Sequence, residues 1–188
     1  AVAGLLLASP VKAEIPTPRV TAVPGDVPGS SGHNYPFFAT DIVLKNFGHV
    51  EEEFFFEGTA NTYANAEPGR NAEVSGSGFP YKSRFLVRRP STAARFNGVV
   101  IVEWFNVTNQ YDTDVLWLYQ KEFFIREGYA WVGVSAQNTG ISNPQTGLKA
   151  WSPQRYGTLD VTAGGRVTND GLSYDIFSQA AAAIRQVL

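Results

Sequence analysis

The stretch NGVVIVEWFNVT at residues 97–108 decides the fold. It opens with the turn dipeptide Asn97-Gly98, and an unbroken apolar run from Val99 to Val102 follows. A strand covered on one face alternates apolar and polar residues, so a continuous apolar run indicates a strand buried on both faces in the middle of a sheet. Polar and aromatic residues end the run. Because ligands bind beyond the carboxyl ends of strands in open α/β sheets, we expect a functional site at this end.

A strand–helix–strand unit is predicted around this stretch. A helix is expected at residues 114–127, with Thr113 as its N-cap and Gly128 as the glycine that ends it. Residues 130–136 form a second, mostly apolar strand. Two strands joined by one helix are expected to lie parallel, with a right-handed crossover.

An antiparallel hairpin is predicted before this unit. Residues 50–60 and 81–89 have strand patterns, and residues 66–80, rich in glycine, are expected to be a loop. The first strand is acidic and the second is basic, so cross-strand ion pairs are expected to help fix the pairing.

Two further segments complete the chain. Residues 138–171 are rich in Gly, Asn, Pro and Thr and predict a long connection, with a hairpin tip at residues 163–166. Apolar residues recur every four positions through residues 172–188, which predicts an amphipathic helix.

Composition limits the possible functions. The 188 residues suit one domain, and the net charge of −2 gives no electrostatic case for binding nucleic acid or an anionic membrane. Cysteine is absent, which excludes disulfides, thiolate metal sites and cysteine nucleophiles. We expect no metal or organic cofactor.

The N-terminal residues have the composition of a targeting segment. Residues 1–13 are similar to the apolar part of a secretory signal, with small residues at the two positions that a signal peptidase reads. The alternative is an apolar arm packed on the domain. Methionine is absent even from position 1, which favours a fragment. Residues 14–45 form an extended Pro/Gly-rich arm, residues 46–188 form the domain, and a secreted or periplasmic location is expected.

Several blocks of the chain resemble one family. They are VEEEFFFEGTA, FLVRRP, FNGVVIVEWFNV, GYAWVGVSAQ and RYGTLDVTAGGRVTNDGLSYDIFSQAA. They are similar to a bacterial, often secreted, α/β-hydrolase-domain family, from about residue 35 to residue 188. The resemblance implies an α/β fold and an esterase-like enzyme with a Ser-His-acid triad. In that family the nucleophile elbow follows the strand after the last helix seen here, so this chain is expected to be the N-terminal half of the fold and inactive alone.

The residues themselves also argue against a triad within the chain. α/β-Hydrolases place the nucleophile first, then the acid and then the histidine, whereas His33 and His49 precede every plausible serine. Ser135 follows a strand, as an elbow serine does, but it lacks the second glycine, and Pro144 follows where a helix is needed. Ser135 is therefore predicted to be a structural serine at a strand end.

An oxyanion-hole donor is the better candidate. In this fold one donor is the N–H of the residue after the nucleophile, and the other lies in the loop after the third strand. Here that loop offers the backbone N–H groups of Phe105, Asn106 and Val107, and the sequence does not choose among them. Glu103, just before the loop, is expected to pair with an arginine or to cap N–H groups of the loop.

Three oxygen-bearing side chains of the long connection are candidate calcium ligands. Asp160, Asn169 and Asp170 do not meet the spacing of a known calcium loop, so turn and cap roles are predicted for them.

The function expected from these observations is that of a secreted serine carboxylester hydrolase, which works through an acyl-enzyme on a small-molecule ester. The alternative is a secreted, β-rich binding module without catalysis, which uses exposed aromatic residues such as Trp151 and Tyr156. The strand–helix–strand pattern argues against that alternative.

Overall fold

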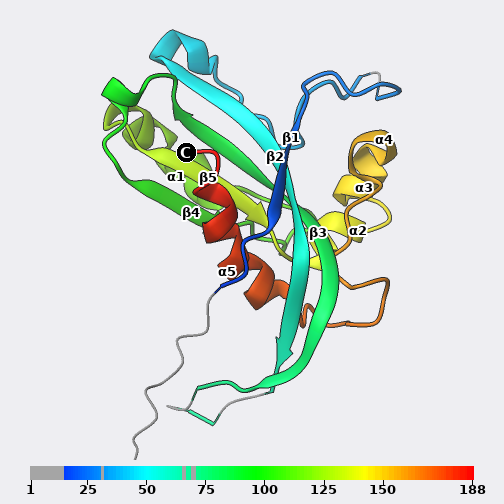
Figure 1. Cartoon of the computed structure of the whole chain (residues 1–188). Helices are drawn as coiled ribbons and strands as arrows, with labels where there is room; N and C mark the ends of the chain where they lie inside the picture. The colour runs from blue at the N-terminus through cyan, green and yellow to red at the C-terminus, as the bar shows by residue number, and fades with distance from the viewer. Residues whose placement is uncertain (1–14, 31, 65–66, 69–70) are drawn as a thin grey trace, which may run out of the picture.

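A computed structural model describes residues 15–30, 32–64, 67–68 and 71–188. The predicted signal segment at residues 1–13 lies outside the described residues. A five-stranded sheet runs through the domain in the order β1-β2-β3-β5-β4 (Figure 1). The strands are β1 (Arg19–Val23), β2 (His49–Tyr63), β3 (Val74–Pro90), β4 (Val100–Trp104) and β5 (Ala130–Ser135). Part of the N-terminal arm is thus a strand of the sheet.

The predicted parallel unit is confirmed. β4 and β5 pair in parallel from Val100 opposite Ala130 to Trp104 opposite Val134, and helix α1 (Val115–Arg126) connects them. Gly128 follows the helix with φ 74°, a left-handed conformation that glycine adopts without steric cost.

The expectation that residues 99–102 lie in the middle of the sheet is wrong for the described chain. β5 lies between β3 and β4, and every β5 residue is buried. β4 lies at the sheet edge, where Val102 is 37% exposed. An apolar run reports a preference for burial, but it does not say which of two apolar strands takes the central place.

The antiparallel hairpin forms with the predicted ion pairs. In the β2–β3 register Glu51 lies opposite Arg88 and Glu57 lies opposite Lys82, and both pairs are in ion-pair contact. Acidic and basic strands therefore align as their charges require.

The loop prediction for residues 66–80 is wrong from Val74 onward, because β3 begins there. A shift of register between Ala60 and Thr62 lets the glycine-rich part of β3 continue the pairing. A Cβ atom at Gly76 would lie 2.9 Å from both the Phe79 ring and Thr62 Oγ1, so glycine allows the strands to approach here.

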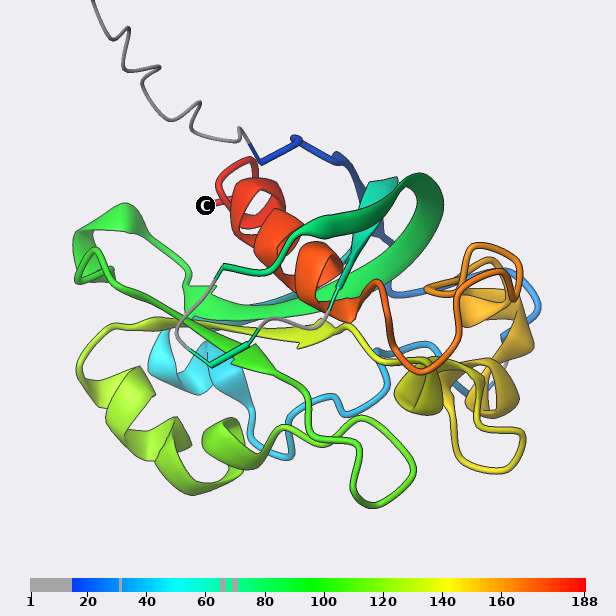
Figure 2. The same cartoon turned by 90° about the horizontal axis from the view of Figure 1, so that it is seen from below.

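Helices cover both faces of the sheet (Figure 2). Helix α5 (Ser173–Ile184) packs on one face, where Ile176 and Ala180 join a core with Phe85 and Val132. Helix α1 lies on the opposite face. Its residues Trp117 and Phe124 form a second core with Leu86, Phe105, Trp131 and Leu44, the last from the short helix η1 (Leu44–Phe47). The predicted amphipathic helix is thus confirmed, although its regular part stops at Ile184.

Short helices occupy the first part of the long connection. They are α2 (Asn138–Ser142), α3 (Leu148–Trp151) and α4 (Pro153–Tyr156), and one more, η2 (Ala93–Arg95), precedes β4. Residues 163–166 form a turn. The Asp160 carboxylate stabilises it by accepting the backbone N–H groups of Thr162 and Gly164. The Val167 N–H donates to the Thr162 carbonyl oxygen at 3.0 Å and closes this turn, so the predicted tip is present, although no regular strands of the described chain flank it. Asp160 forms a β-bridge to Lys82 of β3.

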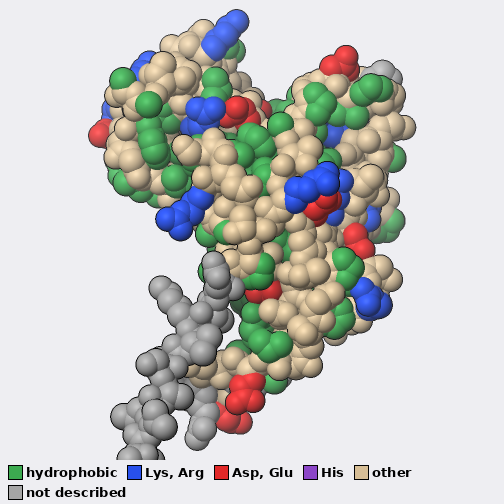
Figure 3. All heavy atoms as spheres, in the orientation of Figure 1, with side chains coloured by type: hydrophobic (Ala, Val, Ile, Leu, Met, Phe, Trp, Pro, Cys, Tyr) green, Lys and Arg blue, Asp and Glu red, His purple; other side chains and the backbone are tan. Residues whose placement is uncertain are grey.

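Charged side chains of both signs are interspersed on the face shown in Figure 3, in keeping with the net charge of −2. No helix in the described part of the chain is long and apolar enough to cross a membrane.

Gly128 and Gly164 provide a matched test of the chain reversal before β5. Both have positive φ, 74° and 71°, but a Cβ at Gly128 would lie 2.2 Å from the Arg95 carbonyl oxygen, whereas nothing lies within 4 Å of a Cβ at Gly164. We expect Gly164→Ala to lower the free energy of unfolding by about 1 kcal/mol and Gly128→Ala by at least about 2 kcal/mol. Urea unfolding followed by circular dichroism measures both, and equal losses would contradict the close approach at Gly128.

Candidate functional site

The β4 loop, residues 105–113, joins β4 to α1 at the carboxyl end of the parallel strands. Backbone hydrogen bonds of 3.1 and 2.9 Å between Asn106 and Thr113 close its neck. Inside the loop, Gln110 has φ 70° and donates its N–H to the Val107 carbonyl oxygen. A non-glycine residue in this left-handed region is uncommon, so the loop has a defined and strained turn.

The three candidate oxyanion-hole donors of the β4 loop differ in whether their backbone N–H groups already make hydrogen bonds. The Phe105 N–H donates to the Val134 carbonyl oxygen at 3.1 Å, and the Asn106 N–H donates to Thr113. The Val107 N–H makes no hydrogen bond within the described part of the chain. Among the three residues that the sequence offered, Val107 is therefore the one whose N–H remains available to a ligand.

Glu103 caps backbone N–H groups, as predicted, but these groups belong to helix α1 and not to the loop. Its carboxylate accepts the backbone N–H groups of Leu116 at 2.7 Å and Trp117 at 3.2 Å, and the Trp131 indole N–H at 2.8 Å. Burial raises the pKa of the Glu103 carboxyl, against the lowering effect of these donors. Glu103 thus caps helix α1, and the prediction of Thr113 as the cap is wrong because a strand residue supplies the carboxylate from outside the helix.

Ser135 is confirmed as a structural serine. It is fully buried at the end of β5, where its Oγ donates to Asp112 and accepts a hydrogen bond of 3.0 Å from Arg84 Nε. A nucleophile must be open to its substrate, and Ser135 has no exposed surface.

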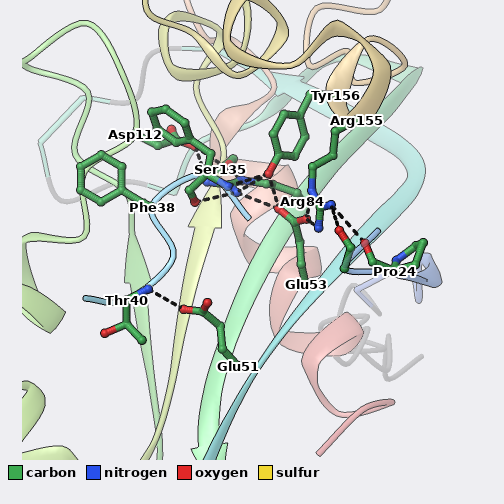
Figure 4. A network of polar contacts seen from close by, with 12 residues as sticks. Pro24, Phe38, Thr40, Glu51, Glu53, Arg84, Asp112, Ser135, Arg155 and Tyr156 are labelled. Atoms are coloured by element: carbon green, nitrogen blue, oxygen red, sulfur yellow. Dashed lines mark hydrogen bonds and ion pairs between the residues drawn. The ribbon is translucent and has the colours of Figure 1, made fainter. Parts of the chain in front are cut away.

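Arg84 lies at the centre of a buried polar network (Figure 4). Its side chain is fully buried. Nη1 donates to Glu53 at 2.8 Å, to the Phe37 carbonyl oxygen at 3.1 Å and to the Tyr156 hydroxyl at 3.2 Å. Nη2 lies 3.5 Å from the Asp112 carboxylate. One guanidinium therefore connects the arm, β2, the β4 loop and α4.

Two further buried arginines extend the network. Arg155 Nη2 lies 2.6 Å from the second oxygen of Glu53. Arg88 contacts Glu51 at 2.8 Å and Asp114 at 2.6 Å. Each buried arginine is thus paired with carboxylates, as buried charges require.

The N-terminal arm is held down by the same arginines. Arg155 Nη1 donates to the carbonyl oxygen of Pro24 at 3.1 Å (Figure 4) and to that of Gly25 at 3.0 Å. Arg88 Nη2 donates to the Phe38 carbonyl oxygen. Charge-assisted bonds of this kind are stronger than neutral ones. The arm is therefore fixed to α4 and to β3 by hydrogen bonds from these arginines.

Asp112 is the interior anchor of the β4 loop. It has no exposed surface, and its Oδ2 accepts from Ser135 and Arg84. Its Oδ1 has no hydrogen-bond partner within the described residues. Burial raises the pKa of its carboxyl, although the Arg84 charge and the Ser135 hydroxyl act in the opposite direction. The sequence does not single out Asp112, because an aspartate in a loop carries no local sign of burial.

The histidines take no part in this site. His33 stacks on Trp151 with ring centroids 3.9 Å apart. His49 is buried at the start of β2, with Nδ1 3.1 Å from the Phe47 carbonyl oxygen, and burial lowers its pKa. Neither ring hydrogen-bonds to a serine within the described residues. They assemble no catalytic triad there, as the order of residues along the chain predicted.

The aromatic residues weighed for a binding module lie in different environments. Trp151 is partly buried and contacts Tyr35 and Phe37 as well as His33. Tyr156 is fully buried, so its choice as an exposed aromatic contact is wrong. Its hydroxyl belongs to the Arg84 network, which explains why it is buried.

The acidic residues of the long connection have the turn and cap roles predicted for them. The Asp170 carboxylate accepts the Asn138 N–H at 2.8 Å and the Gln137 side-chain amide at 3.1 Å. Asp160 closes its own turn. Within the described residues no group of three His, Cys, Asp or Glu side chains is placed to hold a metal ion.

Comparison with known proteins gives one family. A family model described as "Alpha/beta hydrolase domain" matches residues 21–187. Comparisons with the curated proteins and with the solved structures give no significant match. The family match confirms that the sequence blocks belong to an α/β-hydrolase domain. The mixed sheet with helices on both faces accords with a hydrolase-like fold.

Arg84 and Arg89 form a matched pair for testing the buried network. Removing one partner of a buried pair leaves charge uncompensated, so Arg84→Met is expected to lower the free energy of unfolding by about 3–5 kcal/mol. Arg89, 31% exposed and 2.7 Å from Glu52, forms a solvated pair. Its loss in Arg89→Met is expected to change stability by less than about 1 kcal/mol. Thermal or urea unfolding measures both, and an Arg84→Met protein as stable as the parent would refute the structural role of the network.

Proposed function

Because the chain belongs to the alpha/beta hydrolase domain family, we propose that it is part of a serine hydrolase that cleaves carboxylic esters. The nucleophile, acid and histidine are assigned to sequence beyond Leu188, following the chain order of this fold. The serine oxygen attacks the ester carbonyl carbon while histidine takes its proton, and the alcohol leaves with that proton. Water then attacks the acyl-enzyme, which releases the acid and restores the serine.

The observation that carries this proposal is the free Val107 N–H in the β4 loop. The loop follows the strand from which α/β-hydrolases take their second oxyanion donor. Its neck is closed through Asn106 and Thr113, and the Phe105 N–H is also engaged, so Val107 is the candidate best able to donate to a substrate oxygen. We assign it that role and leave Phe105 and Asn106 as supports of the loop.

The proposed substrate is a small-molecule ester and the proposed location is secreted or periplasmic. The location is supported by the signal-like composition of residues 1–13. The proposal requires no metal or organic cofactor, no nucleic acid partner and no membrane partner. The low net charge is in keeping with a neutral ester as substrate.

The direct test is hydrolysis of a p-nitrophenyl ester by the protein that contains this chain together with the sequence that follows it. We expect turnover that a serine-directed phosphonate abolishes, with one labelled serine located by mass spectrometry beyond residue 188. Residues 14–188 alone should give no turnover. Absence of phosphonate labelling in the complete protein, combined with binding to an insoluble glycan, would instead support the binding module.

A proline at position 107 tests the oxyanion donor. Val107→Pro removes the backbone N–H, whereas Val107→Ala retains it and removes only side-chain atoms. We expect Val107→Pro to lower kcat by about 10²–10³ with little change in KM, because the donor acts on charge that develops in the transition state. Val107→Ala should keep kcat within about tenfold of the parent. A folded Val107→Pro enzyme with full activity would assign the second donor to another N–H group.

A further inference from the structure

Only one side chain of the β4 loop beyond its neck reaches the fully buried interior. Asp112 has no exposed surface, although Gln110, nearby in the loop, is exposed. The carboxylate accepts the Ser135 hydroxyl and lies 3.5 Å from Arg84 Nη2. The backbone hydrogen bonds between Asn106 and Thr113 fix the two ends of the loop. Asp112 is placed to fix the orientation of the loop between those ends.

The two groups that hold Asp112 also hold each other. Arg84 on β3 and Ser135 on β5 are directly paired in the sheet register, and Arg84 Nε donates to Ser135 Oγ at 3.0 Å. Asp112, Arg84 and Ser135 therefore form a closed triangle in which each member contacts the other two (Figure 4). A carboxylate held at two points by strand residues has little freedom to move.

Gly140 of α2 connects this anchor with the proposed donor. A Cβ atom at Gly140 would lie 2.0 Å from Asp112 Oδ1 and 3.2 Å from Val107 Cγ1. The φ angle of Gly140 is not positive, so its conformation does not require glycine. The space around Gly140 does require glycine, because a Cβ atom there would collide with Asp112 and crowd Val107. Asp112 and Val107 therefore pack against the same point of α2, so a change at Gly140 acts on both residues.

We propose that Asp112 is a positioning residue, which is held by Arg84 and Ser135 and backed by Gly140, and that it sets the direction of the Val107 N–H toward the substrate oxygen. The inference rests on the proposed function. It gives Asp112, Arg84 and Ser135 a role in the reaction, although none of them contacts the substrate. A donor displaced by about 1 Å loses roughly 10²-fold in rate, so a buried anchor can matter as much as a contacting group.

The test uses Asp112→Asn in the complete hydrolase. Asparagine keeps the shape of the side chain but removes the charge that pairs with Arg84. We expect kcat per active site to fall by roughly 10²-fold, with KM changed by less than about threefold. Gly140→Ala, which forces Asp112 and Val107 apart from α2, should give a loss of the same kind.

Glu51→Gln is the matched control. It removes a carboxylate from Arg88, a buried arginine on the same face of the sheet, but it contacts neither the β4 loop nor Gly140. Its stability should fall while its kcat per active site stays at the parental value. Active sites are counted by phosphonate titration, so that unfolded protein does not enter kcat.

A transition-state analogue separates positioning from general loss of structure. The affinity for a boronic acid that mimics the tetrahedral intermediate should fall in parallel with kcat/KM in Asp112→Asn, whereas the affinity for a product acid should not. Unchanged kcat per titrated site, or equal losses in Glu51→Gln, would overturn the inference. Should Asp112→Asn fail to fold, Ser135→Ala replaces it, with an expected loss of about tenfold. A parent enzyme without phosphonate-sensitive turnover would refute the proposed function itself.

Discussion

Arg84 carries a positive charge on a side chain with no exposed surface, and the domain is arranged to compensate it. An unpaired buried charge costs several kcal/mol, so its partners must be in place whenever the protein is folded. Glu53, Asp112 and the Tyr156 hydroxyl come from β2, the β4 loop and α4, segments far apart in sequence. Pairing one guanidinium therefore fixes the relative positions of these segments, and the candidate site inherits that rigidity.

Arg88 repeats this arrangement four residues further along β3. Its guanidinium lies 4.6 Å from the ring centroids of both Trp117 and Trp131, between helix α1 and the sheet, and its charge is paired with Asp114 at the start of α1. Arginine is suited to this place because its planar group stacks on aromatic rings while its edges donate hydrogen bonds. One face of β3 is thus polar and buried, while its opposite face, with Phe85 and Val87, packs in the apolar core under α5.

The candidate site combines a rigid base with an open tip. The neck of the β4 loop is closed by backbone hydrogen bonds between Asn106 and Thr113, and its anchor Asp112 is hydrogen-bonded to the sheet, whereas the residues at its tip are exposed. Catalytic groups act best when the elements beneath them are rigid, because the reacting geometry tolerates little displacement. A reaction at this site would depend on polar residues that do not contact the substrate. The arm also supports the site, because the carbonyl oxygens of Phe37 and Phe38 accept hydrogen bonds from Arg84 and Arg88.

The sequence by itself determined the features that local patterns encode. Apolar runs predicted the parallel strands, and terminal residues predicted helix α1. The opposite charges of β2 and β3 predicted their ion pairs, and four-residue spacing predicted α5. Each of these patterns is set by the geometry of one element or one hairpin. The sequence also predicted that the loop after residue 104 offers backbone donors, but not which of them is free. Only the tertiary structure decided that Glu103 caps α1, that β5 and not β4 is central, and that Asp112, Ser135 and Arg84 meet. Those contacts join residues 23 and 51 positions apart, and no local pattern reports where distant segments come together.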